Sequence, residues 1–192
     1  MTTTTILGDS GSPEDPSAKS LLRSQLLVLR RGLSAERKAA AEAAICAQLL
    51  DWLRMHPVTS LGVYHPIRQE PDLHSLYNAL ATKGVHLSLP IIRGSGEPLD
   101  FVRWVPGEVL VKDALGTLVP ATKVLAQPQA LLIPCLGFNA QRIRLGYGGG
   151  YYDRTLARQP RPISIGVAYR EALAEFAGEA HDIALDLIIT GL

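Results

Sequence analysis

The segment Arg144-Leu-Gly-Tyr-Gly-Gly-Gly-Tyr-Tyr-Asp-Arg154 constrains the fold of this chain more than any other, because it places four glycines within five positions. It follows the continuous apolar run Ala130 to Leu136, which is typical of a strand buried on both faces. The residues after it, 151–159, predict a helix. In open α/β sheets, ligands bind at the carboxyl ends of the strands, where such a turn lies. The segment therefore predicts an α/β fold with a ligand site at this turn.

Glycines without a Cβ let the backbone adopt positive φ and bring its N–H groups close to an anion, and a following helix adds its positive dipole end. A dinucleotide fingerprint is excluded, because its sixth position counted from Gly146 is Tyr151, and a P-loop is excluded because no Lys is present. We interpret the segment as a phosphate-binding loop of another kind. The flanking Arg144 and Arg154 offer guanidinium groups, and Asp153 offers a carboxylate for Mg²⁺. The alternative is a glycine turn that only packs tightly.

Two helices are predicted in the N-terminal region. The first shows an apolar face at spacings of four, three and four, formed by Leu22, Leu26, Leu29 and Leu33. Ser17 is its expected N-cap and Gly32 its end. Ser34 is expected to cap a second helix that runs to about Met55, before His-Pro.

The remaining chain predicts strands that alternate with helices. Residues 72–83, closed by Gly84, predict a helix between strands at 60–64 and 85–91, which is a βαβ unit with parallel strands. Further strands are expected at 99–104, 130–136, 163–168 and 187–190. The sequence thus predicts one three-layer α/β/α sandwich with a mostly parallel central sheet and a helical N-terminal arm, over residues 17–192, after a flexible tail at 1–16.

The charge and composition restrict the class of partner. The net charge is +1 and 47% of the residues are hydrophobic, which argues against a broad basic surface for nucleic acid or membrane and against disorder. The two cysteines, Cys46 and Cys135, fit buried thiols in a reducing compartment. The N-terminus has no signal-peptide pattern. We expect a cytoplasmic monomer whose partner is a small molecule.

The glycine-rich segment, preceded by Pro134-x-x-x-Phe138, resembles the signature of the 5-formyltetrahydrofolate cyclo-ligase family, also called 5,10-methenyltetrahydrofolate synthetases. Weaker resemblances occur in the same order along the chain, namely Lys19-Ser-Leu-Leu-Arg23, Leu33 to Arg37, Tyr64 to Asp72 with Glu70, Leu99 to Trp104, and His181-Asp182. The chain departs from the pattern where Asn139 replaces Asp, Arg142 replaces Gly and Val119 replaces Glu. Asn tolerates left-handed backbone, whereas Arg142 would be strained there.

The resemblance implies the ATP-dependent closure of 5-formyltetrahydrofolate to 5,10-methenyltetrahydrofolate, with Mg²⁺, and roles for particular residues. Catalytic roles fall on Arg144 and Tyr152. ATP-binding roles fall on Lys19, Ser20, Leu21, Leu22, Arg23, Arg144, Leu145, Gly146, Tyr147, Gly148, Gly149, Gly150, Tyr151 and Tyr152. Folate-binding roles fall on His65, Glu70, Tyr147, Gly148, Gly149, Gly150 and Tyr151, and metal-binding roles on Asp153 and Asp182.

Other interpretations of the same residues stay open. Lys19 and Arg23 share one helix face at i and i+4, which also fits a solvated charged surface. A phosphate-binding isomerase or a CoA-transferase-like protein would bind phosphate without needing Mg²⁺ or Lys19. A non-catalytic folate- or nucleotide-binding paralogue would keep the fold while Asn139 and Arg142 disable turnover.

Overall fold

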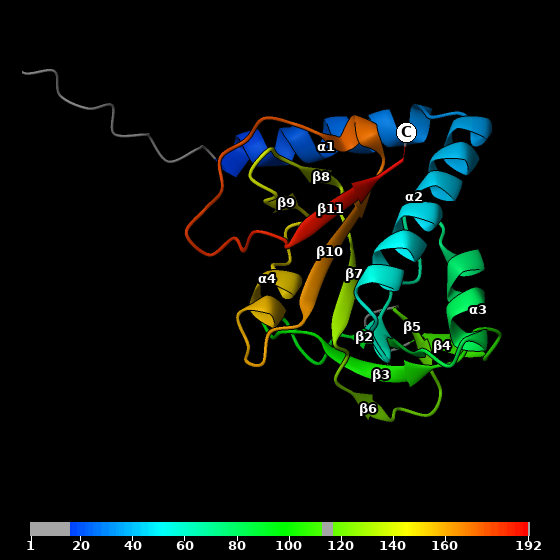
Figure 1. Ribbon diagram of the computed structural model, residues 1–192. Coiled ribbons are helices and arrows are strands. Elements are labelled where there is room, and N and C mark those ends of the chain that lie inside the picture. The colour runs from blue at the N-terminus through cyan, green and yellow to red at the C-terminus, as the bar shows by residue number, and fades with distance from the viewer. Residues whose placement is uncertain (1–15, 113–116, 192) are drawn as a thin grey trace, which may run out of the picture.

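A seven-stranded mixed sheet forms the centre of the computed structural model, which describes residues 16–112 and 117–191 (Figure 1). Its strand order is β11 (Leu187–Thr190), β10 (Ile163–Ala168), β7 (Ala130–Pro134), β1 (Ser60–Gly62), β2 (His86–Ile91), β3 (Asp100–Trp104) and β6 (Leu125–Ala126). The strands from β11 to β2 pair in parallel, and β3 is antiparallel to both of its neighbours, β2 and β6. The expected mostly parallel sheet is confirmed.

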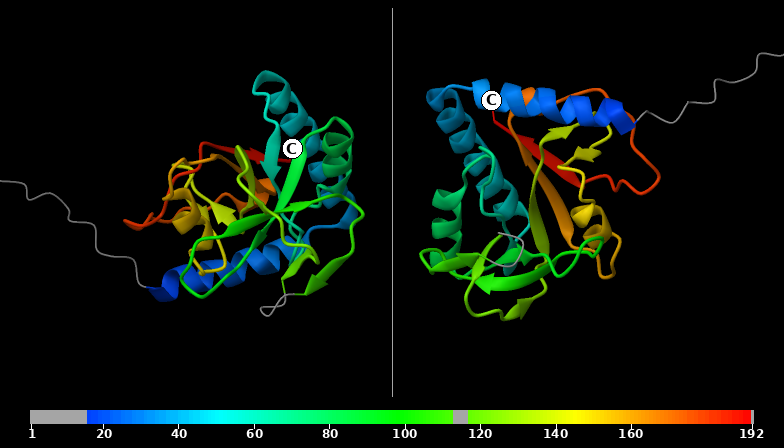
Figure 2. Two further views of the ribbon diagram at one scale, coloured as in Figure 1. Left: turned by 90° about the horizontal axis from the view of Figure 1, so that it is seen from below. Right: turned by 180° about the vertical axis from the view of Figure 1, so that it is seen from behind.

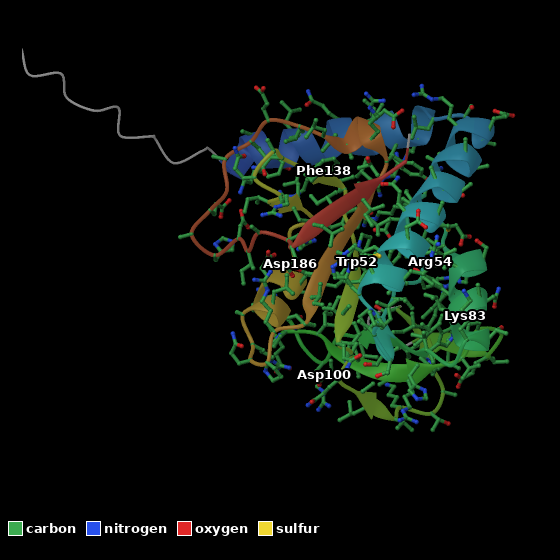
Figure 3. All side chains as sticks on the ribbon, viewed as in Figure 1. Trp52, Arg54, Lys83, Asp100, Phe138 and Asp186 are labelled. Atoms are coloured by element: carbon green, nitrogen blue, oxygen red, sulfur yellow. The ribbon has the colours of Figure 1, made fainter. Side chains whose placement is uncertain are left out.

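Helices cover both faces of this sheet. Helices α2 (Ala35–Met55) and α3 (His74–Thr82) pack on one face, and α4 (Tyr151–Leu156) packs on the other. Strand β7 shows why both faces are apolar, because Leu132 contacts the α2–α3 side and Leu131 contacts the α4 side. Polar residues such as Arg54 and Lys83 lie exposed on the α2–α3 layer (Figure 3). The three-layer prediction is therefore correct.

Helix α1 (Pro16–Gly32) lies across the carboxyl end of the sheet, above the short ribbon of β8 (Gly137–Phe138) and β9 (Arg144–Leu145) (Figure 2). Its buried apolar residue Leu26 packs against Leu136 and Leu145. The helix begins at Pro16, so Ser17 lies within it and is not its N-cap. Leu29 is 45% exposed, contrary to the predicted apolar stripe, and the neighbouring Arg30 is buried instead.

Several element boundaries differ from the sequence prediction. Strand β1 ends at Gly62 and β7 at Pro134, because the chain then leaves the sheet to build the wall of a pocket. Strand β3 begins at Asp100, α3 spans His74–Thr82 and α4 ends at Leu156. The sequence did not predict the antiparallel hairpin of β4 (Leu110–Lys112) and β5 (Leu118–Pro120), the β8–β9 ribbon, the edge strand β6 or the 3₁₀ turn η1 (Arg170–Ala172). These elements are too short to show a period.

Asn139 and Arg142 shape the turn between β8 and β9. The Asn139 side-chain oxygen accepts two backbone N–H groups of the turn, at 3.1 and 2.9 Å, and its amide donates to the Phe176 carbonyl at 2.9 Å. Asn139 thus holds the turn through its side chain rather than through a left-handed backbone. Arg142 has φ 62°, so the expected strain lies at this residue.

Candidate active site

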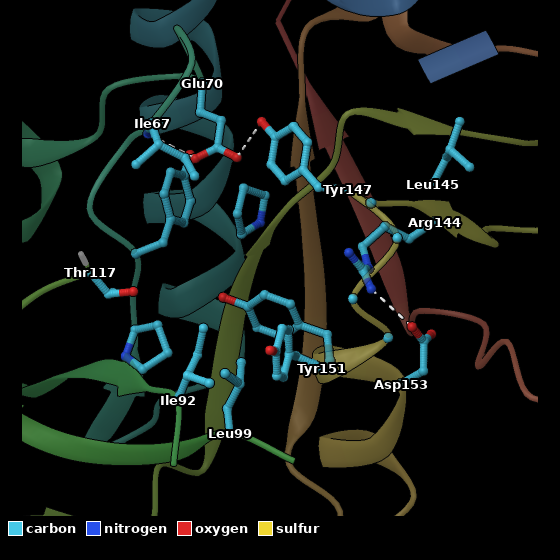
Figure 4. Close-up of a pocket in the computed structure, with 18 of the residues that line it drawn as sticks. Ile67, Glu70, Ile92, Leu99, Thr117, Arg144, Leu145, Tyr147, Tyr151 and Asp153 are labelled. Carbon is cyan, nitrogen blue, oxygen red and sulfur yellow. Dashed lines mark hydrogen bonds and ion pairs between the residues drawn. The ribbon is translucent and has the colours of Figure 1, made fainter. Parts of the chain in front are cut away.

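A pocket of about 780 Å³ opens at the carboxyl ends of the parallel strands, between the glycine-rich segment and the loop after β1 (Figure 4). Most of the residues predicted for the site line it together. They are Lys19, Arg23, His65, Glu70, Arg144, Leu145, Gly146, Tyr147, Gly148, Gly149, Gly150, Tyr151, Tyr152, Asp153 and Asp182. The structure therefore brings together residues from the first helix, the middle of the chain and its last quarter.

Three predicted nucleotide-binding residues do not line this pocket. Ser20 and Leu21 are exposed, and Leu22 packs with the apolar cluster under α1. Residues four apart share one face of a helix, so Lys19 and Arg23 both face the pocket and the three residues between them do not.

Lys19 and Arg23 lie at one end of the pocket, which we call the phosphate end because the sequence resemblance implies ATP-binding roles for these residues. Lys19 is buried, and its Nζ lies 2.7 Å from Glu179 Oε1 and 3.3 Å from Asp182 Oδ2. Burial lowers the pKa of Lys19, but these two carboxylates outweigh it and raise that pKa above its usual value. Arg23 Nε donates to the carbonyl of Gly146 at 3.0 Å. The helix thereby fixes the start of the glycine-rich segment.

Arg144 and Asp153 form a second ion pair at the phosphate end. Arg144 Nη2 lies 3.0 Å from Asp153 Oδ2, and the two side chains are only 8% and 11% exposed. The guanidinium also stands over the ring of Tyr152, at 5.2 Å from its centroid. Asp153 additionally accepts the backbone N–H of Ile183 at 3.3 Å. The two predicted metal residues, Asp153 and Asp182, are thus both paired with cations.

The acidic residues fit a magnesium ion that is shared with phosphate oxygens. Among the described residues, no group of three or more His, Cys, Asp or Glu side chains is arranged to hold a metal alone. Mg²⁺ in nucleotide sites usually takes one or two carboxylates and completes its shell with phosphate and water. Asp153 and Asp182 supply that number of carboxylates beside the pocket.

The glycines of the segment have different roles. Gly148 has φ 95° and Gly150 has φ 61°, so both need the left-handed backbone that glycine adopts without strain. Gly149 is needed for space, because a Cβ there would lie 2.6 Å from the Tyr151 ring. Helix α4 after this loop has six residues, which is shorter than expected. The basic side chains, rather than the end of a long helix, are therefore the main positive groups at this end of the pocket.

Glu70 lies at the opposite end of the pocket, which we call the folate end because the sequence resemblance implies a folate-binding role for this residue. Its Oε1 accepts the hydroxyl of Tyr147 at 2.9 Å, and its Oε2 accepts the N–H of Ile67 at 3.0 Å. Burial raises the pKa of Glu70, while these hydrogen bonds and the nearby Arg30 and Arg68 act in the opposite direction. The carboxylate is 4% exposed but lines the pocket, so it is available to a bound ligand.

Apolar and aromatic side chains complete the folate end. Leu89, Pro90, Ile92 and Leu99 line this part of the pocket. Figure 4 shows the side chain of Tyr151 near those of Ile92 and Leu99. The Nδ1 atom of His65 is buried without a hydrogen-bond partner. Burial, followed by the neighbouring His74, lowers the pKa of His65. A mostly apolar cavity with a few polar groups and aromatic rings suits a planar heterocycle.

Arg30 is a buried cation beside the pocket that the sequence analysis missed, as it also missed the lining residues Arg68 and Glu179. Its guanidinium is 2% exposed and reaches the hydroxyl of Tyr147 at 3.1 Å. A signal was present, since Lys19, Arg23 and Arg30 are spaced by four and seven residues and so share one side of a helix. Arg30 interrupts an apolar stripe of the helix. Burying a charge there costs free energy, so a buried arginine at this position indicates a function.

Comparison with known proteins identifies related sequences and structures. A profile of the 5-formyltetrahydrofolate cyclo-ligase family matches residues 15–191. The 5-formyltetrahydrofolate cyclo-ligase of Mycolicibacterium smegmatis is 31% identical over 189 residues, which cover 91% of this chain and 94% of that protein. The enzyme of the same name from Mycoplasma pneumoniae is 29% identical, over 89% and 97% of the two chains.

Two solved structures have the same architecture. The 5,10-methenyltetrahydrofolate synthetase of Mycoplasma pneumoniae superposes with a TM-score of 0.74 and 28% identity, over 90% of this chain and 98% of that one. The synthetase of Aquifex aeolicus superposes with a TM-score of 0.75 and 28% identity, over 89% and 88% of the two chains. No helix among the described residues has the length and apolar character needed to cross a membrane.

Proposed function

Because the chain belongs to the 5-formyltetrahydrofolate cyclo-ligase family, we propose that its pocket is the site where ATP drives closure of 5-formyltetrahydrofolate to 5,10-methenyltetrahydrofolate. The protein is an ATP-dependent ligase of this family. One observation carries the proposal for the site. One pocket joins a basic, glycine-lined end to a mostly apolar end that contains Glu70.

The reaction needs activation of a poor electrophile. The formyl oxygen attacks the γ-phosphorus of ATP, the bond from that phosphorus to the β–γ bridging oxygen breaks, and ADP leaves. Nitrogen 10 of the folate then attacks the formyl carbon and loses its proton, and the carbon–oxygen bond breaks to release phosphate. The protein supplies no nucleophile. It must align the reacting atoms and balance the charge that develops on the phosphoryl group.

The phosphate end supplies this charge balance. Lys19, Arg23 and Arg144 offer three cationic groups, and the glycines allow close approach of the triphosphate. We assign catalytic roles to Arg144 and Tyr152, because the guanidinium lies over that ring beside the loop. Asp153 and Asp182 would hold Mg²⁺, which neutralises the transferring phosphoryl group.

The folate end supplies recognition. The Glu70 carboxylate accepts N–H donors of the heterocycle, Tyr147 holds that carboxylate, and Tyr151 and His65 offer ring surfaces. The three residues that depart from the family pattern do not line the pocket. Asn139 and Arg142 lie outside the pocket lining, and Val119 is buried against Ile91 and Val102. Their positions support an active enzyme over a non-catalytic paralogue.

A single assay tests the function. The purified protein is mixed with MgATP and 5-formyltetrahydrofolate, and the near-ultraviolet absorbance of the methenyl product is followed. We expect absorbance to rise in proportion to ADP release. Binding of both ligands without product would indicate a paralogue that does not turn over. Phosphate binding without folate binding would indicate an isomerase-like or transferase-like protein.

A further inference from the structure

Arg30 lies at the end of a chain of hydrogen bonds that leads to the folate end. Its Nη2 donates to the carbonyl of Cys135 at 2.6 Å, and its Nη1 donates to the Tyr147 hydroxyl at 3.1 Å. That hydroxyl donates in turn to Glu70 at 2.9 Å. Because a guanidinium can only donate, it occupies a lone pair of the hydroxyl and directs the single phenolic proton toward the carboxylate.

The guanidinium also carries charge into a buried place. Arg30 is 2% exposed and Glu70 is 4% exposed, so solvent screens neither group well. A positive charge of this kind favours the ionised form of a nearby carboxylate against the effect of its burial. The hydrogen bond to Cys135 anchors the guanidinium to the chain just after β7. Arg30 thus both directs the hydroxyl proton of Tyr147 and favours the ionised form of Glu70.

We propose that Arg30 is a positioning residue for folate recognition, which orients Tyr147 and balances the negative charge of Glu70. The proposal rests on the proposed function, because it takes Glu70 as the group that contacts the folate. An ionised carboxylate offers only acceptors, so it selects a ligand edge that carries N–H donors. A neutral carboxyl group would present its own proton and recognise a different edge.

Other groups around Glu70 bear on its ionisation. Arg68 lies on the same loop, and its guanidinium stands 4.6 Å from the centroid of the Tyr147 ring. The titratable groups near the carboxylate from other elements are Tyr64, Cys135, Tyr147 and Tyr152. Burial raises the pKa of each, so none carries charge at neutral pH. Arg30 is therefore the buried cation among these neighbours, and Arg68 approaches from the rim.

The test compares Arg30→Met, Arg30→Lys and Tyr147→Phe with the wild-type protein. Arg31→Met is the matched control, since Arg31 is exposed on the same helix. The Glu70 side-chain carboxyl is titrated by carbon NMR with labelled glutamate and assigned with Glu70→Gln. The affinity for 5-formyltetrahydrofolate is measured without ATP between pH 5 and 8, and the melting temperature of each variant is recorded.

We expect Arg30→Met to raise the titration midpoint of Glu70 by about one unit. The loss of folate affinity on acidification should move upward by the same amount, and affinity at pH 7 should fall about tenfold. ATP affinity should change less than folate affinity. Arg30→Lys should restore the midpoint, because the charge returns, and Tyr147→Phe should weaken folate binding although the charge stays.

Two results would overturn this inference and leave the proposed function standing. One is an unchanged Glu70 midpoint and unchanged folate pH profile in Arg30→Met, with only a lower melting temperature. The other is a failure of Arg30→Lys to restore either quantity. If Arg30→Met does not fold, Arg30→Lys and Tyr147→Phe decide the question. A wild-type protein that binds no folate would overturn the proposed function together with the inference.

Discussion

Glu70 is buried, and burial disfavours the charged form of its carboxyl group. Since burial raises its pKa, the folded protein takes up a proton that the unfolded chain does not, between the ordinary value of 4.5 and the raised value. Its contribution to the free energy of unfolding therefore falls as pH rises through this interval and stays low above it. Such a cost at neutral pH is typical of a residue kept for binding rather than for stability.

Glu70→Gln tests this balance. We expect its melting temperature at pH 7 to be no lower than that of the wild-type protein, because the amide avoids burial of a charge. The affinity for 5-formyltetrahydrofolate should fall about tenfold, as for the loss of a charged hydrogen bond. Thermal unfolding and folate titration measure the two effects. A variant that loses stability but keeps its folate affinity would place Glu70 in the scaffold.

Gly148 and Gly84 form a matched pair for the glycine-rich segment. Their φ angles are 95° and 83°, and an added Cβ meets no atom within 4 Å at Gly84 and only the Arg23 guanidinium, at 3.8 Å, at Gly148. Alanine at either position should cost about 1 kcal/mol of stability, or roughly 2–4 °C. Only Gly148→Ala should lose turnover, by about a hundredfold, because its Cβ displaces the phosphates.

Melting temperature and turnover with MgATP are compared for both glycine variants. Equal turnover in the two variants would mean that the segment is only a tight turn. Gly149 differs from both glycines, because its φ is not positive and an added Cβ would lie 2.6 Å from the Tyr151 ring.

At the scale of elements, α1 shows what periodicity can and cannot predict. The sequence correctly predicted the helix and its buried residues Leu26 and Leu33, because a repeat of hydrophobic residues is local information. It wrongly placed Leu29 in the core. The helix is oriented so that Arg30 is buried. The groups that accept hydrogen bonds from its guanidinium belong to residues more than 100 positions away in the sequence. Such partners are invisible to a local pattern.

Some strands were likewise predictable from the local sequence and others were not. The long apolar run of β7 was predicted because burial on both faces leaves a continuous signal. The β4–β5 hairpin and the β8–β9 ribbon escaped prediction, because strands of two or three residues contain no period. The site was predictable where a motif is contiguous, as in the glycine-rich segment. The folate end was predictable only through resemblance, since its apolar wall comes from separate strands.

Arg23→Ala tests the role of α1 in nucleotide binding. Its Nε fixes the Gly146 carbonyl, and the guanidinium lines the pocket. We expect a loss of about 1.5–3 kcal/mol in ATP binding or turnover, which is the range for hydrogen bonds to charged groups. Arg31→Ala, exposed on the same helix, should behave like the wild-type protein. If both variants have equal ATP kinetics, Arg23 belongs to a solvated helix surface.

At the scale of the molecule, the three cations of the phosphate end, Lys19, Arg23 and Arg144, are matched by three carboxylates, those of Asp153, Glu179 and Asp182. Lys19 is paired with Glu179 and Asp182, and Arg144 is paired with Asp153. A nucleotide that attracts the cations would release carboxylates, which then become available to a metal. Metal and nucleotide should therefore bind cooperatively, because each relieves the charge that the other leaves uncompensated.

Thermal unfolding with separate ligands checks this cooperativity. Millimolar Mg²⁺ alone should leave the melting temperature unchanged, whereas MgATP at a hundred times its dissociation constant should stabilise by about 2.7 kcal/mol, or roughly 5–10 °C. Chelation of Mg²⁺ should abolish formation of the methenyl product. Equal rates after thorough chelation would remove the metal from the mechanism, and strong stabilisation by Mg²⁺ alone would contradict the pairing of its ligands.

The placement of α1 also sets an order of events during protein synthesis. Arg30 is made 117 residues before Tyr147, and Lys19 is made 160 residues before Glu179. At about 5–20 residues per second, Arg30 is made roughly 6–23 s before its partner Tyr147. A nascent chain that ends before β10 therefore carries Lys19 without Glu179 and Asp182, the two carboxylates that pair with it. Helix α1 reaches its final electrostatic surroundings only after nearly the whole chain has been made.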